Sequence, residues 1–438
     1  MRIRIRPVQS LSGRVTVPGD KSISHRAGIL GAIAEGVTEI HGYLEAEDCL
    51  GTLAALGALG ADVTRKGPGE YRVAGAGLRG LQEPTDVIDC GNSGTTVRLL
   101  LGVLAGQPFW TMLTGDESLR RRPMGRVAEP LRRMGATIVG RSDGARLPLA
   151  IRGSERLRGL AYELPVASAQ LKSALLLAGL YADGPVSVRE PAPSRDHTER
   201  MLRQFGGRVE RHADTVTLTS SPLRGTMIRV PGDISSAAFL LVAGLIVPSA
   251  RVTVADVGLN PSRTGLLDTL REMSARLEAT VSGEVPEDGE PVGTVTAETS
   301  PLRGTTVGGA LIPRLIDEVP ALAVAAAVAS GRTEIRDAAE LRVKESDRIA
   351  ALARGLGAFG ALVTEREGGL VIDGGRRLRG ARVTSGGDHR LAMALALAGL
   401  VADGETIVDD TECINTSFPQ FVDAVNVLAG EPALVVEG

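Results

Sequence analysis

The sequence predicts an α/β protein of two lobes, each made of three β-α-β-α-β-β repeats around buried parallel helices. Three observations carry this prediction. A chain of 438 residues is too long for one ordinary hydrophobic core. One sequence unit recurs six times, with a period of roughly seventy residues. The first helix of each unit is almost wholly apolar, which is typical of a helix that is buried on every side.

The first half of each unit reads as a strand, a polar turn, an Ala/Leu-rich helix and a β-branched strand. Its six copies begin VPGDKSISHR, VIDCGNSGTT, LPVASAQLKS, VPGDISSAAF, LIDEVPALAV and TSGGDHRLAM. In the second half an amphipathic helix ends in small residues and runs into a strand, as in LRRMGATIV and LRQFGGRVE. The sixth copy, FPQFVDAVNVLAG, reads as truncated by the C-terminus.

Six units divide most simply into three per lobe. The first strand, ending near Val17, is expected to complete the C-terminal lobe. The predicted N-terminal lobe is therefore 20–231, and the C-terminal lobe is 1–19 plus 232–438. We expect the active site in the cleft between these lobes.

Composition narrows the class of protein. A content of 43% hydrophobic and 23% charged residues is typical of a soluble globular protein, and MRIRIRPVQS has no apolar core of a signal peptide. The three cysteines, Cys49, Cys90 and Cys413, form no C-x-x-C pair and fit a reducing compartment. We expect a cytoplasmic monomer without membrane or nucleic-acid partners, the latter because the net charge is −3. The five histidines lack metal-ligand spacing, so neither a metal nor another cofactor is expected.

Lysine is rare in this chain. Of the 49 basic residues only Lys21, Lys66, Lys172 and Lys344 are lysines. Lysine can shift its pKa and pass a proton, whereas arginine effectively cannot. Lys21 and Lys344 lie in dense polar motifs and are candidates for function, whereas chance retention is a fair interpretation of Lys66 and stays open for Lys172.

Polar residues gather at the predicted N-termini of the six apolar helices. GDKSISHR does not have the spacing of a nucleotide-binding P-loop, because Asp20 separates Gly19 from Lys21. A helix N-terminus nevertheless offers unpaired N–H groups and a positive dipole end, which together favour an anion. Each cluster alone could be a helix cap, but six together predict an anionic ligand. The clusters are Lys21, Ser22 and Arg26; Asn92, Ser93, Gly94 and Thr95; Ser168, Ala169 and Gln170; Asp233, Ser235 and Ser236; Asp317 and Glu318; Asp388, His389 and Arg390.

Three further polar segments follow at corresponding places in the repeats: GDESLRRRPMGR, PAPSRDHTER and ELRVKESDRIAA. In the last of these, Lys344 and Arg348 are four residues apart and are predicted to share a helix face, with Glu345 beside them. A solvated charged helix is an equally good interpretation of KESDR alone.

Taken together, these motifs resemble the 3-phosphoshikimate 1-carboxyvinyltransferase (EPSP synthase) family. The resemblance rests on GDKSISHR, GNSGTT, the RRP of 121–123, SAQLKSA, SRDHTE, IDE, LRVKESDR and GGDHRLAMA, and it covers essentially the whole chain in order. It implies the two-lobed enolpyruvyl transferase fold, an inside-out α/β barrel. It also implies transfer of the enolpyruvyl group of phosphoenolpyruvate to the 5-hydroxyl of shikimate 3-phosphate, in the shikimate pathway of aromatic amino-acid biosynthesis, without metal or cofactor.

The resemblance also implies site residues. For catalysis it implies Asp317 as the base, and Glu345 with Lys21 as the acid. The expected contacts of shikimate 3-phosphate are Lys21, Ser22, Arg26, Ser168, Ala169, Gln170, Arg195, Asp317 and Lys344. The expected contacts of phosphoenolpyruvate are Lys21, Gly94, Arg122, Gln170, Arg348 and Arg390. In this family the herbicide glyphosate occupies the phosphoenolpyruvate site, beside the residue that corresponds to Gly94.

The chain departs from some family members at two places, and two alternatives stay open. Ala169 stands where certain relatives have Ser, and Thr416 stands where they have a Lys that contacts phosphoenolpyruvate. One alternative is the sister family, UDP-N-acetylglucosamine 1-carboxyvinyltransferase. That family typically has Asn at the position of Ser22 and a reactive Cys in the loop that here reads GDESLRRRP. The other is a non-catalytic phosphometabolite-binding protein, which has no need of Asp317 and Glu345.

Overall fold

The computed structural model describes residues 1–438, and they form two compact units. The N-terminal lobe consists of Gly19–Val230 together with Val285–Glu290. The C-terminal lobe consists of Met1–Pro18, Pro231–Glu284 and Pro291–Gly438. Each lobe has a hydrophobic core of its own. None of the helices has the length and apolar character needed to cross a membrane.

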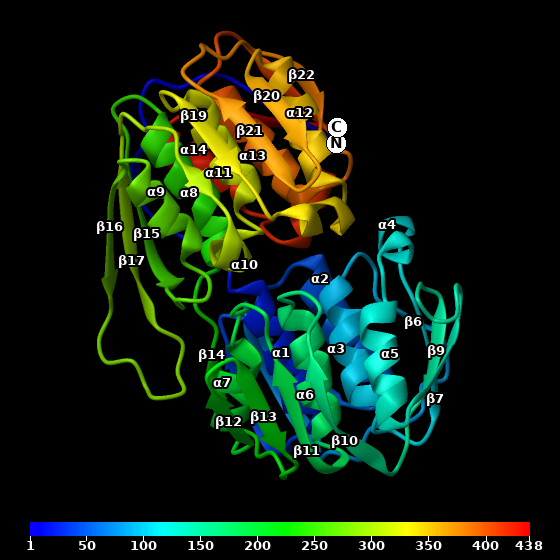
Figure 1. Cartoon of the computed structure of the whole chain (residues 1–438). Coiled ribbons are helices and arrows are strands. Elements are labelled where there is room, and N and C mark those ends of the chain that lie inside the picture. The colour runs from blue at the N-terminus through cyan, green and yellow to red at the C-terminus, as the bar shows by residue number, and fades with distance from the viewer. The chain divides into compact units, whose positions relative to one another are not determined.

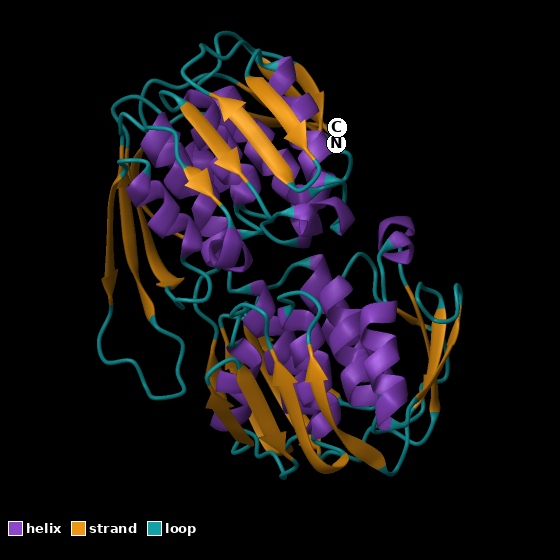
Figure 2. Cartoon of the chain, viewed as in Figure 1, coloured by secondary structure: helices purple, strands orange, loops and turns teal.

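Each of the six repeats forms one four-stranded sheet, which agrees with the four strands of the predicted β-α-β-α-β-β unit. The first two strands of a repeat pair in parallel, and the fourth strand lies antiparallel between the second and the third, as the order β10-β11-β13-β12 shows. In both lobes the sheets lie outside and the helices inside (Figure 2). This arrangement confirms the predicted two-lobed, inside-out α/β class.

The N-terminal lobe contains repeats one to three (Figure 1). Its central helices α1, α3 and α6 are buried along most of their length, as their apolar sequences predict. The elements of repeat one are β14 (Met227–Arg229), α1 (Lys21–Ile33), β3 (Glu35–His41), α2 (Glu47–Ala58), β4 (Asp62–Gly67) and β5 (Glu70–Ala76). Those of repeat two are β6 (Ile88–Asp89), α3 (Gly94–Leu104), β7 (Trp110–Thr114), α4 (Glu117–Arg121), α5 (Gly125–Met134), β8 (Thr137–Gly140) and β9 (Leu149–Arg152). Those of repeat three are β10 (Leu157–Glu163), α6 (Ala169–Gly179), β11 (Ala182–Arg189), α7 (His197–Gln204), β12 (Arg208–His212) and β13 (Thr215–Thr219).

The C-terminal lobe contains repeats four to six around the buried helices α8, α11 and α13. The elements of repeat four are β2 (Ser12–Thr16), α8 (Ile234–Ile246), β15 (Arg251–Gly258), α9 (Gly265–Glu272), β16 (Arg276–Val281) and β17 (Val292–Glu298). Those of repeat five are β18 (Thr306–Val307), η1 (Gly309–Leu311), α10 (Ile312–Leu315), α11 (Val319–Val328), β19 (Arg332–Ile335), η2 (Ala339–Val343), α12 (Arg348–Ala358), β20 (Leu362–Arg366) and β21 (Gly369–Asp373). Those of repeat six are β22 (Arg382–Thr384), α13 (His389–Leu400), β23 (Thr406–Asp409), η3 (Thr411–Thr416), α14 (Phe421–Ala429), β24 (Leu434–Glu437) and β1 (Arg2–Ile5).

Two repeats take their first strand from a distant part of the chain. The strand β2 pairs in parallel with β15, so the N-terminal segment supplies the first strand of repeat four. Reciprocally, β14 pairs in parallel with β3 and supplies the first strand of repeat one. Residues 285–290 differ from the predicted division, because this loop between β16 and β17 belongs with the N-terminal lobe. There it bonds to α7, where His197 Nδ1 lies 2.7 Å from Glu290 Oε1 and Arg200 donates to the Gly289 carbonyl at 2.8 Å.

The sixth repeat is complete, which corrects the expectation that the C-terminus truncates it. The N-terminal strand β1 lies between β23 and β24 and is antiparallel to both. Arg2 faces Asp409 on one side and Glu437 on the other. The first residues of the chain therefore supply the strand that the C-terminal copy lacks, a pairing that linear repeat alignment could not detect.

Candidate active site

The first two turns of α1 place Ser22 and Arg26 on one side of the helix. The Asp20 carboxylate caps the helix by accepting the Ile23 N–H at 2.9 Å. The Arg26 guanidinium is buried and donates from Nη1 to the Ser22 carbonyl at 2.8 Å, one helical turn away. Its Nε and Nη2 donate to Thr198 Oγ1 at 2.6 Å and to Ser173 Oγ at 2.8 Å. Helices α1, α6 and α7 therefore jointly fix the orientation of Arg26.

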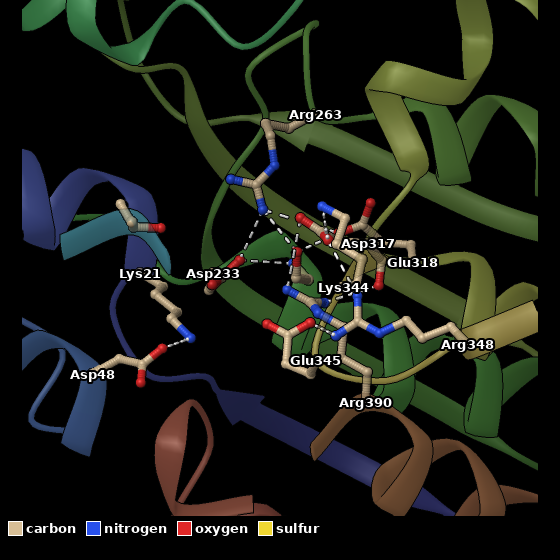
Figure 3. A network of polar contacts seen from close by, with 12 residues as sticks. Lys21, Asp48, Asp233, Arg263, Asp317, Glu318, Lys344, Glu345, Arg348 and Arg390 are labelled. Carbon is tan, nitrogen blue, oxygen red and sulfur yellow. Dashed lines mark hydrogen bonds and ion pairs between the residues drawn. The ribbon is translucent and has the colours of Figure 1, made fainter. Parts of the chain in front are cut away.

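Lys21 forms a close ion pair with Asp48 on the first turn of α2 (Figure 3). The lysine side chain is 16% exposed and the carboxylate 8%, so the pair is largely shielded from water. Sequence reasoning missed Asp48, because EAEDC resembles no ligand motif and its role depends on packing of α2 against α1.

The guanidinium of Arg98, a residue that the sequence analysis did not identify, lies beside both Gly94 and Gln170. Gln170 accepts from Arg98 Nη1 at 2.5 Å and donates to Thr95 Oγ1 at 2.9 Å. A β-carbon added to Gly94 would lie 3.0 Å from Arg98 Nη1 and 3.3 Å from Arg122 Nη1. The spacing of Gly94 and Arg98, one helical turn apart on α3, was the available signal.

The remaining predicted residues of the N-terminal lobe lie on loops and at a helix cap. Arg122 is buried and donates from Nη2 to Asn92 Oδ1 at 2.6 Å, which joins the RRP loop to the start of α3. Ser168 caps α6 by accepting the Leu171 N–H at 3.4 Å, and Ala169 is the first residue of that helix. Arg195 lies in the loop that precedes α7. The three helix starts thus carry the polar groups that the sequence placed there.

In the C-terminal lobe the predicted residues converge on Asp317 (Figure 3). Lys344 Nζ and Arg348 Nη1 each lie 3.5 Å from Asp317 Oδ1. Arg390 Nη1 donates to the Asp317 carbonyl at 2.9 Å, and its Nη2 lies 4.0 Å from the carboxylate. Three cationic side chains from two motifs, LRVKESDR and GGDHRLAMA, therefore surround one carboxylate.

Arg348 is the most heavily paired cation of this group. It is 1% exposed and donates to Asp388 through Nε at 2.8 Å and to Glu345 through Nη2 at 2.7 Å. Burial works against its charged form, but Asp388, Glu345 and Asp317 prevail and hold the pKa of Arg348 above its ordinary range. Glu345, the predicted acid, thus accepts a hydrogen bond directly from Arg348, which is predicted to bind phosphoenolpyruvate.

The prediction that Lys344 and Arg348 share a helix face was wrong. The 3₁₀ helix η2 ends at Val343, Lys344 is in extended backbone, and α12 begins only at Arg348. The reason is Asp347, whose carboxylate accepts the Ala350 N–H at 3.0 Å and caps α12 at that point. Lys344 and Arg348 meet at Asp317 through the loop between the two helices.

A second buried network adjoins Asp317 in the sequence and was not predicted. Arg263 Nη2 donates to Ser235 Oγ at 2.7 Å and to Asp233 Oδ1 at 3.1 Å (Figure 3). Ser235 in turn donates to Glu318, the neighbour of Asp317 in the chain. Asp233 also caps α8, so the cap interpretation holds for its cluster.

Two of the three cysteines, Cys90 and Cys413, lack the properties of a reactive thiol. Burial raises the pKa of Cys90 to about 12, and burial likewise raises the pKa of Cys413 to about 12. The loop 115–126 contains no cysteine. The residue Thr416 donates locally to the Cys413 carbonyl at 2.8 Å.

Fold and candidate residues together define a class: a two-lobed α/β repeat protein whose buried helices begin at clustered cations and carboxylates. The sequence matches the family described as EPSP synthase (3-phosphoshikimate 1-carboxyvinyltransferase) over residues 5–425. The chain therefore belongs to the EPSP synthase family, a family of transferases.

Relatives and solved structures agree along the whole chain. It is 55% identical to the 3-phosphoshikimate 1-carboxyvinyltransferase of Desulforudis audaxviator, over 98% of this chain and 99% of the relative. It is 56% identical to the enzyme of that name from Gloeobacter violaceus, over 95% of this chain and 96% of the relative. The solved EPSP synthase of Acinetobacter baumannii matches 100% of both chains with a TM-score of 0.86 and 44% identity.

Proposed function

We propose that this chain transfers the enolpyruvyl group of phosphoenolpyruvate to the 5-hydroxyl of shikimate 3-phosphate, releasing phosphate. The product is 5-enolpyruvylshikimate 3-phosphate, an intermediate of aromatic amino-acid biosynthesis. The observation that carries the proposal is the Asp317 carboxylate, with Lys344 and Arg348 each 3.5 Å away and Arg390 on its carbonyl. A carboxylate held among cations suits a reaction that needs a base beside anionic substrates.

Substrate binding is assigned by charge. Both substrates carry a phosphate and a carboxylate, about six negative charges in all. Arginine forks match phosphate and carboxylate oxygens, and helix N-termini add N–H donors. The residues that bind shikimate 3-phosphate are Lys21, Ser22, Arg26, Ser168, Ala169, Gln170, Arg195, Asp317 and Lys344. The residues that bind phosphoenolpyruvate are Lys21, Gly94, Arg122, Gln170, Arg348 and Arg390.

The chemistry divides between two carboxyl groups. Asp317 accepts the proton of the 5-hydroxyl as that oxygen attacks C2 of phosphoenolpyruvate. Glu345, assisted by Lys21, donates a proton to the methylene carbon, which gives a tetrahedral intermediate. In the second step Glu345 takes a proton back from that carbon as the C–O bond to phosphate breaks. The bond of 2.7 Å from Arg348 to Glu345 keeps this carboxyl group beside the residue that is to bind phosphoenolpyruvate.

The test is acceptor-dependent release of phosphate from phosphoenolpyruvate, measured in the presence of EDTA. We expect release with shikimate 3-phosphate and none without an acceptor or with UDP-N-acetylglucosamine. Release only with the nucleotide sugar would favour the sister transferase. Binding of both ligands without any release would favour a non-catalytic phosphometabolite-binding protein.

Location and assembly belong to the same proposal. The three cysteines are free thiols in the fold, which suits a reducing cytoplasm. We propose that the protein acts as a monomer, so sedimentation equilibrium is expected to give a mass near 45.6 kDa. A mass of twice that value would contradict this part of the proposal.

A further inference from the structure

Lys172 is a fully buried lysine on α6, with no exposed side-chain surface. Its ammonium lies 3.0 Å from Glu190 Oε2 and 2.6 Å from Glu199 Oε1. Arg211 approaches the same carboxylates from the other side, at 3.4 Å from Glu190 and 3.9 Å from Glu199. Two carboxylates thus meet two cations, of which Lys172 is fully buried and Arg211 is 32% exposed. A buried ammonium is tolerated only with such pairing.

The Lys172 cluster ties down the loop between β11 and α7. Glu190 directly follows β11, and Glu199 lies in the first turn of α7. Between them, Ser194 donates its N–H to Glu190 Oε1 at 3.2 Å and its hydroxyl to the same oxygen. The Lys172 ammonium also lies 3.5 Å from the Ser194 carbonyl. The next residue along the chain is Arg195, so the cluster fixes the backbone from which this arginine projects.

The same cluster stands one residue away from the groups that hold Arg26. Thr198, which precedes Glu199, accepts from Arg26 Nε at 2.6 Å. Ser173, which follows Lys172, accepts from Arg26 Nη2 at 2.8 Å, and its hydroxyl lies 2.6 Å from that of Thr198. A shift of α7 relative to α6 would therefore move two of the hydrogen-bond partners of Arg26.

We propose that Lys172 is a positioning residue for the phosphate-binding arginines: by bridging Glu190 and Glu199 it sets the orientation of Arg195 and Arg26 toward the phosphate monoester of the acceptor. This inference rests on the proposed function. Lys172 itself touches no substrate, because its side chain has no exposed surface. Its effect is specific to the acceptor, since none of the groups it holds is assigned to phosphoenolpyruvate.

The experiment compares substrate constants of Lys172 variants with those of a structural control. Lys172→Met leaves two buried carboxylates with less compensation and is expected to destabilise the lobe. The triple variant Lys172→Met, Glu190→Gln, Glu199→Gln removes the three buried charges together and leaves only that of the partly exposed Arg211, so it keeps a protein that can be assayed if the single variant does not fold. The control is Ile151→Ala on β9, a fully buried core residue in another repeat of the same lobe.

For both Lys172 variants we expect the Kd of shikimate 3-phosphate, measured by calorimetry, to rise roughly 10- to 100-fold, the effect of a displacement of about 1 Å in a binding group. The KM of phosphoenolpyruvate at saturating acceptor and kcat are expected to stay within about threefold of wild type. The Ile151→Ala control is expected to lower the unfolding midpoint without changing the Kd.

Two results would overturn the inference. One is an unchanged Kd of shikimate 3-phosphate in the triple variant, which would make the cluster merely structural. The other is a rise by the same factor in the KM of both substrates together with a fall in kcat, which would show a general distortion of the site. Failure of the proposed function is distinguishable, because then the wild-type protein itself would release no phosphate with shikimate 3-phosphate.

Discussion

The guanidinium of Arg348 binds both carboxylate oxygens of Asp388, from Nε to Oδ2 at 2.8 Å and from Nη2 to Oδ1 at 3.2 Å. Both side chains are buried, and Asp388 also caps α13 by accepting the N–H of Arg390 at 3.0 Å. One carboxylate therefore joins the starts of α12 and α13, because it binds the side chain of Arg348 and the backbone of Arg390. A paired arginine of this kind is held in one rotamer before substrate arrives.

Neutralising Asp388 is expected to weaken phosphoenolpyruvate binding and stability together. In Asp388→Asn the buried Arg348 loses its bidentate partner, which should lower the free energy of unfolding by about 3–5 kcal/mol. The KM of phosphoenolpyruvate should rise roughly 10- to 100-fold. The matched control is Asp409→Asn. Asp409 binds Arg382 with the same two-pronged geometry, at 2.8 and 3.2 Å, but on the surface, so its loss should have little effect on stability. Equal losses in the two variants would contradict this.

Amide replacements should separate chemistry from binding at Asp317 and Glu345. Asp317→Asn and Glu345→Gln keep shape and hydrogen bonding but cannot carry the proton, so turnover should fall by about 10² to 10⁴. Substrate Kd values should change little. The control is Glu365→Gln in the same lobe, where Glu365 pairs with Arg342 at 2.9 Å on a partly exposed face and turnover should be unchanged. Near-normal turnover in either test variant would remove that residue from the mechanism.

The fold was largely predictable because the local sequence pattern of each repeat predicts its helices and strands. The apolar runs at 21–33, 234–246 and 389–400 are helices, and Asp20, Asp233 and Asp388 cap them as residues of that type do. What failed was the closure of repeat six by β1, because pairing between the two ends of a chain leaves no local pattern. The predicted helix over KESDR was also wrong, because Asp347 caps α12 and the helix begins only at Arg348.

The candidate site was predictable in its cations but not in their partners. Charge counting in motifs found Lys21, Arg348 and Arg390, yet it treated them as available for substrate charge. In the fold each has an acidic or carbonyl partner: Asp48 for Lys21, Asp388 for Arg348 and the Asp317 carbonyl for Arg390. Such partners come from other repeats or other helices, so only tertiary packing brings them together. The same holds for Lys172, whose carboxylates lie 18 and 27 residues further along the chain.

The buried His25 should make stability fall at mildly acidic pH. Burial, and then the charges of Lys21 and Arg26, lower the pKa of His25 well below its ordinary value of 6.5. Below pH 6.5 the unfolded chain therefore binds a proton that the folded chain does not, and the free energy of unfolding decreases as pH falls. The slope is about 1.4 kcal/mol per pH unit, down to the lowered pKa of the folded state.

His25→Asn should remove this contribution while keeping a polar group near Thr52, whose Oγ1 lies 2.6 Å from His25 Nδ1. Urea unfolding of the two proteins between pH 5 and pH 8 measures the effect. We expect a constant difference in stability above about pH 7.5, where the imidazole is neutral in both states, and a narrowing difference below about pH 6.5. Parallel curves across the whole range would show that His25 titrates alike in folded and unfolded chains.

The last prediction concerns Gly94→Ala, at the start of α3. The added β-carbon would lie 3.0 Å from Arg98 Nη1 and 3.3 Å from Arg122 Nη1, so both flexible guanidinium groups must give way by a few tenths of an ångström. The variant should therefore also bind phosphoenolpyruvate somewhat more weakly, because Arg122 is one of the residues proposed to bind it. Glyphosate is longer than phosphoenolpyruvate and should suffer more from the methyl group. A clash of about 1–3 kcal/mol, the usual range for overpacking, would give roughly 10- to 100-fold discrimination. The measurement is the inhibition constant of glyphosate against the KM of phosphoenolpyruvate in wild type and variant. If both change by the same factor, Gly94 acts only through Arg98 and Arg122 and does not face the inhibitor.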